Sequence, residues 1–201
     1  MASRLRVDIF CEDRAHEELL RGLVARICAE EGAVGEIAAR SATGGHGRAL
    51  DELGLYQRIA RLHSAPDLLV VAIDTNCRSY RDAVREIEAK IDASAFPYHA
   101  LACPNPHIEL WYMADANAFE RVVGVRPLAP QPSCGKQTRN ELKHALARAV
   151  RSAGHPVLFG GIEFARELAQ AMDPFVAGKV DAGLRHFVRD LRAAVRQLTS
   201  R

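Results

Sequence analysis

Oxygen-bearing side chains follow two apolar segments of the chain. Glu12 directly follows one such segment, and Asp74 and Asn76 follow another. Magnesium and manganese prefer oxygen ligands, typically one or two carboxylates together with water and substrate phosphates. Carboxylate and amide oxygens of this kind form such a set if the fold brings them together. We therefore predict a site for Mg²⁺ or Mn²⁺ made of Glu12, Asp74 and Asn76, with Glu12 and Asp74 as the catalytic acids.

Acids at the ends of strands also have a structural use, because they cap the helix that follows. Asp13 stands before a predicted helix at 15–30, and Asp74 stands before a predicted helix at 78–91. For Asp13 we prefer the capping role. For Glu12 and Asp74 together we favour the metal site.

The elements that must position these residues alternate between strands and helices. Apolar or alternating runs predict strands, and stripes of apolar residues at helical spacing predict the helices between them. The strands are expected at 5–11, 35–39, 67–73 and 97–103, and the helices at 15–30, 51–63 and 78–91. This order predicts an α/β fold, a Rossmann-like, mostly parallel four-stranded sheet flanked by helices. In such sheets ligands bind beyond the carboxyl ends of the strands.

The second half of the chain has a helical pattern throughout. A helix is expected at 108–123, followed by a proline-bearing connector at 126–133 and by further helices at 139–152, 162–172 and 180–198. We divide the chain into an α/β core at 1–125 and a helical C-terminal extension at 134–201 that packs on the core. The alternative is that both parts form one domain.

The net charge of +2 conceals an uneven distribution. Residues 136–201 contain 12 Lys and Arg against 6 Asp and Glu, a charge of +6, and residues 1–135 contain 15 against 19, a charge of −4. An acidic half with a basic extension suits a metal site that faces a phosphate-bearing substrate. A solvated helical face explains the basic residues equally well.

The bulk composition excludes several classes of protein. No apolar run reaches the roughly 18 residues of a membrane span, and the first ten residues lack a signal peptide, so we expect a cytoplasmic protein without a membrane partner. The five cysteines form no CxxC pair, which predicts reduced thiols and argues against a disulfide framework or a zinc ribbon. The sequence contains no Gly-x-Ser-x-Gly elbow, so it gives no indication of a serine hydrolase.

Two basic residues are candidates for phosphate binding. Arg48 follows a glycine-rich loop at 44–47, where the backbone could approach a ligand closely. Lys136 follows Gly135, but Gln137 stands where a P-loop requires Ser or Thr, so the segment is not a P-loop. An ordinary surface loop is the commoner explanation for the glycine-rich segment.

Three motifs, taken in order, resemble the Toprim domain of topoisomerases, primases and related nucleases. They read IFCEDRAHEELL at 9–20, LLVVAIDTNC at 68–77 and CPNPHIELWYMAD at 103–115. The third is similar to a helix of uncharacterised bacterial Toprim-like proteins related to RloB and to the Toprim half of overcoming-lysogenization-defect nucleases. The resemblance covers residues 5–115.

The resemblance implies a divalent-metal-dependent phosphotransfer protein, most plausibly a nuclease in nucleic-acid processing or defence, with nucleic acid and an ATPase as partners. It adds Glu109 and Asp115 as acids that contact the substrate. Glu109 also has a structural explanation, because the helix dipole favours an acid in the first turn of a helix. Trp111 is expected in the core.

Two departures from the Toprim pattern lead to an alternative function. Asp13 stands where glycine usually follows the motif Glu, and Asn76 replaces the second acid of Asp-x-Asp. A site with one charge fewer binds Mg²⁺ more weakly. The alternative is a non-catalytic Toprim-like module that binds nucleic acid or a partner protein.

Overall fold

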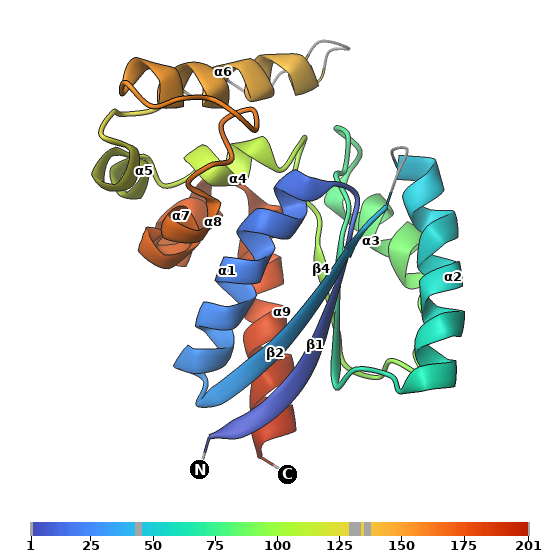
Figure 1. Cartoon of the computed structure of the whole chain (residues 1–201). Helices are drawn as coiled ribbons and strands as arrows, with labels where there is room; N and C mark the ends of the chain where they lie inside the picture. The colour runs from blue at the N-terminus through green and yellow to red at the C-terminus, as the bar shows by residue number, and fades with distance from the viewer. Residues whose placement is uncertain (1, 43–45, 129–133, 135–137, 201) are drawn as a thin grey trace.

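The protein has an α/β fold built on a four-stranded parallel sheet. A computed structural model describes residues 2–42, 46–128, 134 and 138–200 of the chain. The strands lie in the order β2-β1-β3-β4 and run in the same direction (Figure 1). Their bounds are Ser3–Cys11 for β1, Ala33–Ser41 for β2, Leu68–Ala72 for β3 and His99–Ala102 for β4. The predicted fold class is confirmed, and the sheet is wholly parallel within the described residues.

The two central strands end level with each other. β1 pairs with β3 in a register that places Cys11 beside Ala72, the last residue of each strand. Because both strands run in the same direction, the residues that follow them emerge at one edge of the sheet. This carboxyl edge is where Glu12 and Asp74 lie.

Helices cover both faces of the sheet. α1 (Arg14–Glu30) and α9 (Ala182–Thr199) lie on one face, and α2 (His46–His63) and α3 (Tyr80–Glu88) lie on the other (Figure 1). Alternate residues of the fully buried strand β3 point to opposite faces. Leu68, Val70 and Ala72 accordingly belong to the core beneath α1 and α9, and Leu69 and Val71 belong to the core beneath α2.

The C-terminal half of the described chain is helical, with two differences from prediction. Residues 108–123 form two helices, α4 (Glu109–Met113) and α5 (Ala116–Val123), because Asp115 interrupts the first and caps the second. α8 (Pro174–Val180) was not predicted, although Asp173 followed by proline is a typical helix start. The remaining helices are α6 (Thr138–Ser152), α7 (Ala165–Ala171) and α9.

One hydrophobic core joins the predicted core and its extension. The core on the α1 face includes residues of β1 and α1 together with residues of α6, α7 and α9. Trp111 is fully buried, as expected, and its ring stacks on Phe187 of α9 at 5.9 Å between centroids. Since α9 covers a face of the sheet, the C-terminal half completes the core that the first half begins. This arrangement favours the single-domain alternative.

The cysteines differ from the sequence prediction. Cys77 and Cys134 form a disulfide, whereas Cys11, Cys28 and Cys103 are free and buried. Spacing in the sequence did not indicate this pair, because the two residues are 57 positions apart and meet only when the β3–α3 loop lies beside the chain before α6. No described helix is both long enough and apolar enough to cross a bilayer.

Candidate functional site

Glu12 and Asp74 contact each other at the carboxyl edge. The backbone N–H of Asp74 donates to Glu12 Oε2 at 3.2 Å, and the backbone N–H of Glu12 donates to the carbonyl of Ala72 at 3.0 Å. Both acids are buried, with 3% and 2% of their surfaces exposed. The structure thus brings together the two acids that follow the first and third predicted strands, which are neighbours in the sheet.

Three donors from two other parts of the chain hold the Asp74 carboxylate. Its Oδ1 accepts from His16 Nε2 at 3.0 Å and from the backbone N–H of Ile108 at 2.9 Å. Its Oδ2 lies 2.9 Å from Nδ1 of His107. Asp74 does not cap α3, whose N-cap is Ser79. It instead ties β3 to α1 and to the segment that follows β4.

His16 lies between two carboxylates and is fully buried. Its Nδ1 is 2.8 Å from Oδ1 of Asp13, which also caps α1 by accepting from the backbone N–H groups of Ala15 and His16. The capping role predicted for Asp13 is confirmed. The line Asp13–His16–Asp74 joins the start of α1 to the end of β3.

The charged side chains of Asp13, His16 and Asp74 stabilise one another. Burial alone would lower the pKa of His16, but the charge of Asp74 and hydrogen bonds to both acids raise it to about 10. Burial would raise the pKa of Asp74 and of Asp13, but the charge of His16 and its hydrogen bonds hold both pKa values below their usual range. At neutral pH His16 is therefore an imidazolium that donates from both ring nitrogens to ionised carboxylates.

His16 and His107 have no role in the site predicted from the sequence. The spacing of Asp13 and His16, three positions apart at the start of a helix, is a detectable signal for their contact. The contacts of the two histidines with Asp74 span 58 and 33 positions, and no local pattern indicates them.

The predicted metal ligands do not fit a divalent cation as they are arranged. Asn76 is exposed, and its side chain contacts the backbone, because its Nδ2 donates to the carbonyl of Asp74. Oδ1 of Asp74 already accepts two hydrogen bonds, one of them from the imidazolium of His16, which a cation would have to displace. Among the described residues no three His, Cys, Asp or Glu side chains are arranged to hold a metal ion.

Glu109 is a buried acid with an incomplete set of partners. It begins α4, and its Oε1 lies 3.6 Å from Nζ of Lys143 on α6. Its Oε2 is buried and has no hydrogen-bond partner within the described part of the chain. Burial, together with the negative charge of Asp74, raises the pKa of Glu109. A carboxyl group in this environment holds a proton more readily than an exposed one.

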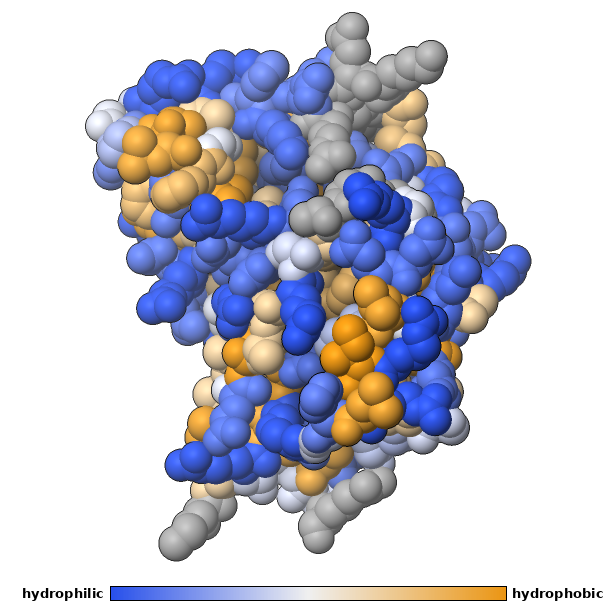
Figure 2. All heavy atoms as spheres, turned by 45° about the vertical axis from the view of Figure 1, so that its right-hand side comes forward, coloured by the Kyte–Doolittle hydropathy of each residue, from blue (hydrophilic) through white to orange (hydrophobic). Residues whose placement is uncertain are grey.

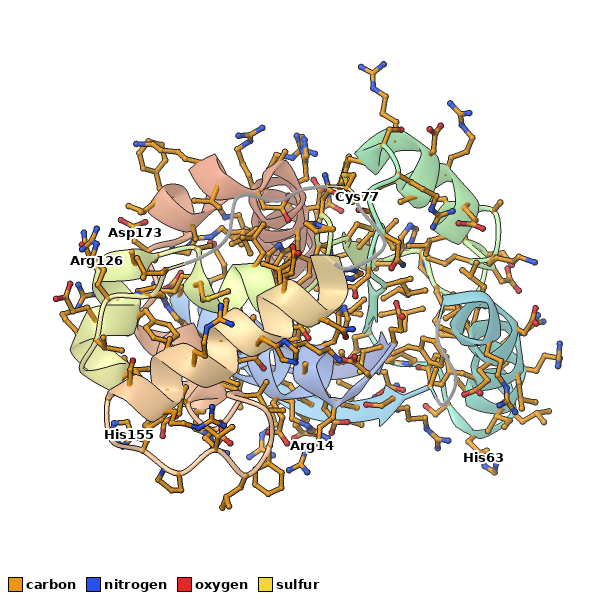
Figure 3. All side chains as sticks on the ribbon, turned by 90° about the horizontal axis from the view of Figure 1, so that it is seen from above. Arg14, His63, Cys77, Arg126, His155 and Asp173 are labelled. Atoms are coloured by element: carbon orange, nitrogen blue, oxygen red, sulfur yellow. A yellow bond between two sulfur atoms is a disulfide. The ribbon has the colours of Figure 1, made fainter. Side chains whose placement is uncertain are left out.

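A pocket of about 280 Å³ opens beside Glu109. It lies where the start of α1 meets α4, α6 and the chain before α7, and Figure 3 looks down on this end of the molecule with Arg14 labelled. Its polar lining consists of two acids and two bases, and its apolar lining includes Phe159, whose ring lies 4.4 Å from the guanidinium carbon of Arg14. The lining residues are Asp13, Arg14, Ala15, Glu109, Lys143, Phe159, Gly160 and Ile162.

The other predicted substrate contacts are not part of this pocket. Asp115 is buried, caps α5, and accepts from the backbone N–H of Asp173 at 2.9 Å, so its carboxylate holds two chain segments. Arg48 is exposed in the first turn of α2. Lys136 and residues 44 and 45 lie outside the described residues.

Much of the positive charge of α9 is neutralised within the molecule. Arg192 forms ion pairs with Glu30 and Glu31, Arg196 pairs with Glu31, and Arg189 pairs with Asp190. The pairs of Arg192 and Arg196 hold α9 against the end of α1, whereas the pair of Arg189 lies within α9. The basic composition of residues 136–201 therefore does not by itself indicate a surface for nucleic acid.

Comparisons with protein-family models, with curated proteins and with solved structures find no significant match to this chain. The resemblance to Toprim proteins therefore rests on the three sequence motifs and enters below as a proposal.

Proposed function

We propose that this chain is a Toprim-like phosphotransfer protein that acts on nucleic acid as a nuclease. The observation that carries the proposal is the contact between Glu12 and Asp74, which follow adjacent parallel strands and meet at the carboxyl edge. That edge is the usual ligand-binding side of an open α/β sheet. The third motif contributes Glu109 to the same edge, beside a pocket of about 280 Å³.

The pocket contains groups suited to a phosphate ester. Arg14 and Lys143 are cations that bind phosphate oxygens, Arg14 with a planar fork and Lys143 as a compact charge. Burial and the charge of Asp74 raise the pKa of Glu109, so it holds a proton more readily than an exposed acid does. We assign it the role of general acid or base at the reacting oxygen. The Asp13–His16–Asp74 line fixes the start of α1, which presents Arg14.

A second candidate function is a non-catalytic Toprim-like module that binds nucleic acid or a partner protein such as an ATPase. The hydrogen bonds of Asp74 favour this second function. The acid that Toprim enzymes present to a metal is buried here, and its carboxylate contacts His16, Ile108 and His107. The replacement of the second acid by Asn76 points the same way. These roles need no cation at Asp74.

A cleavage assay separates the two functions. Wild type, Glu12→Gln and Glu109→Gln would be incubated with end-labelled single- and double-stranded DNA and RNA, each with Mg²⁺, with Mn²⁺ or with a chelator. We expect cleavage by wild type and a loss of about 100-fold or more in both variants, the usual contribution of a general acid or base. Glu167→Gln is the matched control, because Glu167 is exposed on α7.

The same assay identifies the metal requirement and the alternative. Cleavage that continues in the presence of the chelator assigns the chemistry to the side chains alone. Cleavage that needs Mg²⁺ or Mn²⁺ supports the metal requirement predicted from the sequence. Tight binding without cleavage, unchanged by the chelator and by Glu12→Gln, supports the non-catalytic module. Neither cleavage nor binding of any nucleic acid contradicts the phosphotransfer proposal.

A further inference from the structure

Within the described part of the chain, no helix covers one face of the edge strand β2. β2 is an edge strand, and the side chains of Val34, Glu36, Ala38 and Arg40 are exposed along it. Arg40 pairs with Phe10, which packs beneath α2, so these four residues share the α2 side of the sheet. On the other side of β2, Ile37 and Ala39 pack against the core beneath α1.

An apolar stripe on α2 borders this open face. Leu55, Ile59 and Leu62 recur at helical spacing and are 49%, 36% and 83% exposed. Leu55 and Ile59 line a groove of about 520 Å³ whose opposite wall includes Arg40 and Ser41 of β2. Figure 2, in which α2 comes forward, shows a hydrophobic patch on this side surrounded by hydrophilic side chains. A contiguous patch of this kind commonly marks an interface.

The backbone of β2 has a free edge suited to another strand. The N–H of Ala42 donates to the carbonyl of Cys11 on β1, so even-numbered residues of β2 turn their backbone groups toward β1. The odd-numbered residues 35 to 41 therefore turn theirs outward. Ile37 O accepts from Arg21 Nη1 at 3.2 Å, and a carbonyl oxygen has a second lone pair for a further donor.

The charges along β2 are complementary to those of a second, antiparallel copy of β2. Glu36 and Arg40 lie on the same face with Ala38 midway between them. If a two-fold axis passes through Ala38, an antiparallel second β2 places its Arg40 opposite Glu36 and its Glu36 opposite Arg40. Odd residues 37 and 39 then oppose each other as a hydrogen-bonded pair, and residues 36 and 40 form the closer pair without hydrogen bonds. The outward-facing backbone groups and the charges thus select the same register.

We propose that a second copy of this chain docks on β2 in this antiparallel register, so that one sheet continues through both copies. Opposite charges directly across an antiparallel pair stabilise it, and like charges destabilise it. The stripes of the two α2 helices flank the joined strands and bury Leu55 and Ile59. A closed two-fold dimer is also the commonest symmetry of soluble oligomers.

Sedimentation equilibrium of wild type and two variants tests the dimer. Wild type is expected to be dimeric at micromolar concentration. Arg40→Glu places two pairs of like charges across the interface and should weaken the dimer at least about 10-fold, because like-charge juxtaposition is strongly unfavourable. The double exchange Glu36→Arg with Arg40→Glu restores opposite charges and should recover the dimer. Arg151→Glu, an exposed change on α6, is the control for net charge.

Two results would overturn the proposal. One is a wild type that stays monomeric up to about 100 μM, roughly a hundred times the concentration at which the dimer is expected. The other is a dimer that Arg40→Glu leaves unchanged, because such a dimer uses another surface. Glu36 and Arg40 do not belong to the pocket beside Glu109, so the outcome is independent of the phosphotransfer proposal.

Discussion

His16 Nε2 lies 3.0 Å from Asp74 Oδ1, in a hydrogen bond between residues 58 positions apart that are both buried. This contact connects the first turn of α1 to the end of β3, and through Asp13 and His107 it extends to the helix cap and to the chain after β4. The carboxyl edge is therefore held by charged hydrogen bonds beneath the pocket. Its rigidity determines where Arg14 and Glu109 are presented.

Replacing His16 by glutamine should destabilise the protein by about 3–5 kcal/mol, the usual cost of removing one partner from a buried ion pair. Asp74 and Asp13 would both lose the charge that compensates their burial. Urea denaturation followed by the fluorescence of Trp111, the single tryptophan, measures the change in free energy of unfolding. His63→Gln, an exposed change at the end of α2 (labelled in Figure 3), should stay within about 1 kcal/mol. Equal effects of the two changes would contradict the role of His16.

The stability of the protein should fall in alkali because of the same residue. The pKa of His16 is raised to about 10, above the value near 6.5 of an unfolded histidine. Its stabilisation is therefore fully present below about pH 6.5, declines between about pH 6.5 and 10, and is lost above that. Denaturation curves at a series of pH values should show this decline in wild type, and His16→Gln should lack it. Parallel curves for both proteins would refute the assignment.

At acid pH the protein should lose the contribution of Asp13 and Asp74 to its stability. The pKa values of Asp13 and Asp74 are lowered, so their stabilisation is present above about pH 3.9, the unfolded value, and is lost as the pH falls through the folded values. Asp74→Asn should therefore lose less stability than wild type between pH 5 and pH 2. Denaturation in that interval measures the difference, and an equally steep loss in the variant would show that other acids dominate.

Gly183 is placed where no side chain fits. A Cβ at this position, near the start of α9, would overlap the backbone carbonyl of Cys103 at the end of β4. Gly183→Ala should destabilise the protein by about 1–3 kcal/mol, the cost of overpacking a core. Gly54→Ala in α2 meets no atom within 4 Å and should stabilise by about 0.5–1 kcal/mol, because alanine favours a helix. Thermal denaturation of both variants gives the sign of each change in stability. A Gly183→Ala variant as stable as wild type would contradict the close approach of α9 to Cys103.

The Cys77–Cys134 disulfide predicts a response to reductant. Thiol titration of the unfolded protein should give three free thiols without reductant and five after reduction. Reduction should lower the free energy of unfolding by about 2–4 kcal/mol, because the disulfide closes a long loop. Cys77→Ser is the control, since reductant should not change its stability further. Five thiols without reductant would support the reduced state expected from the sequence.

The sequence alone was sufficient to predict the sheet and the placement of two acids at its carboxyl edge. Segments such as 67–73 are apolar enough to be recognised as buried strands, and the alternation with helices implies parallel strands. Parallel strands end at one edge, so the placement of Glu12 and Asp74 at that edge follows from local patterns and one topological rule, whereas their contact depends on β1 lying beside β3. The helix cap at Asp13 and the burial of Trp111 were predicted in the same way.

Tertiary structure decided the rest, because the partners come from distant segments. The contacts of Asp74 with His16 and His107, the disulfide of Cys77 and the pairing of Glu109 with Lys143 each join segments more than 30 positions apart. Local periodicity reports which face of an element is apolar, but not which polar side chain from another element meets it. The burial of Asp74 beneath two histidines, which changes a predicted metal ligand into the centre of a hydrogen-bonded network, could be seen only in the folded chain.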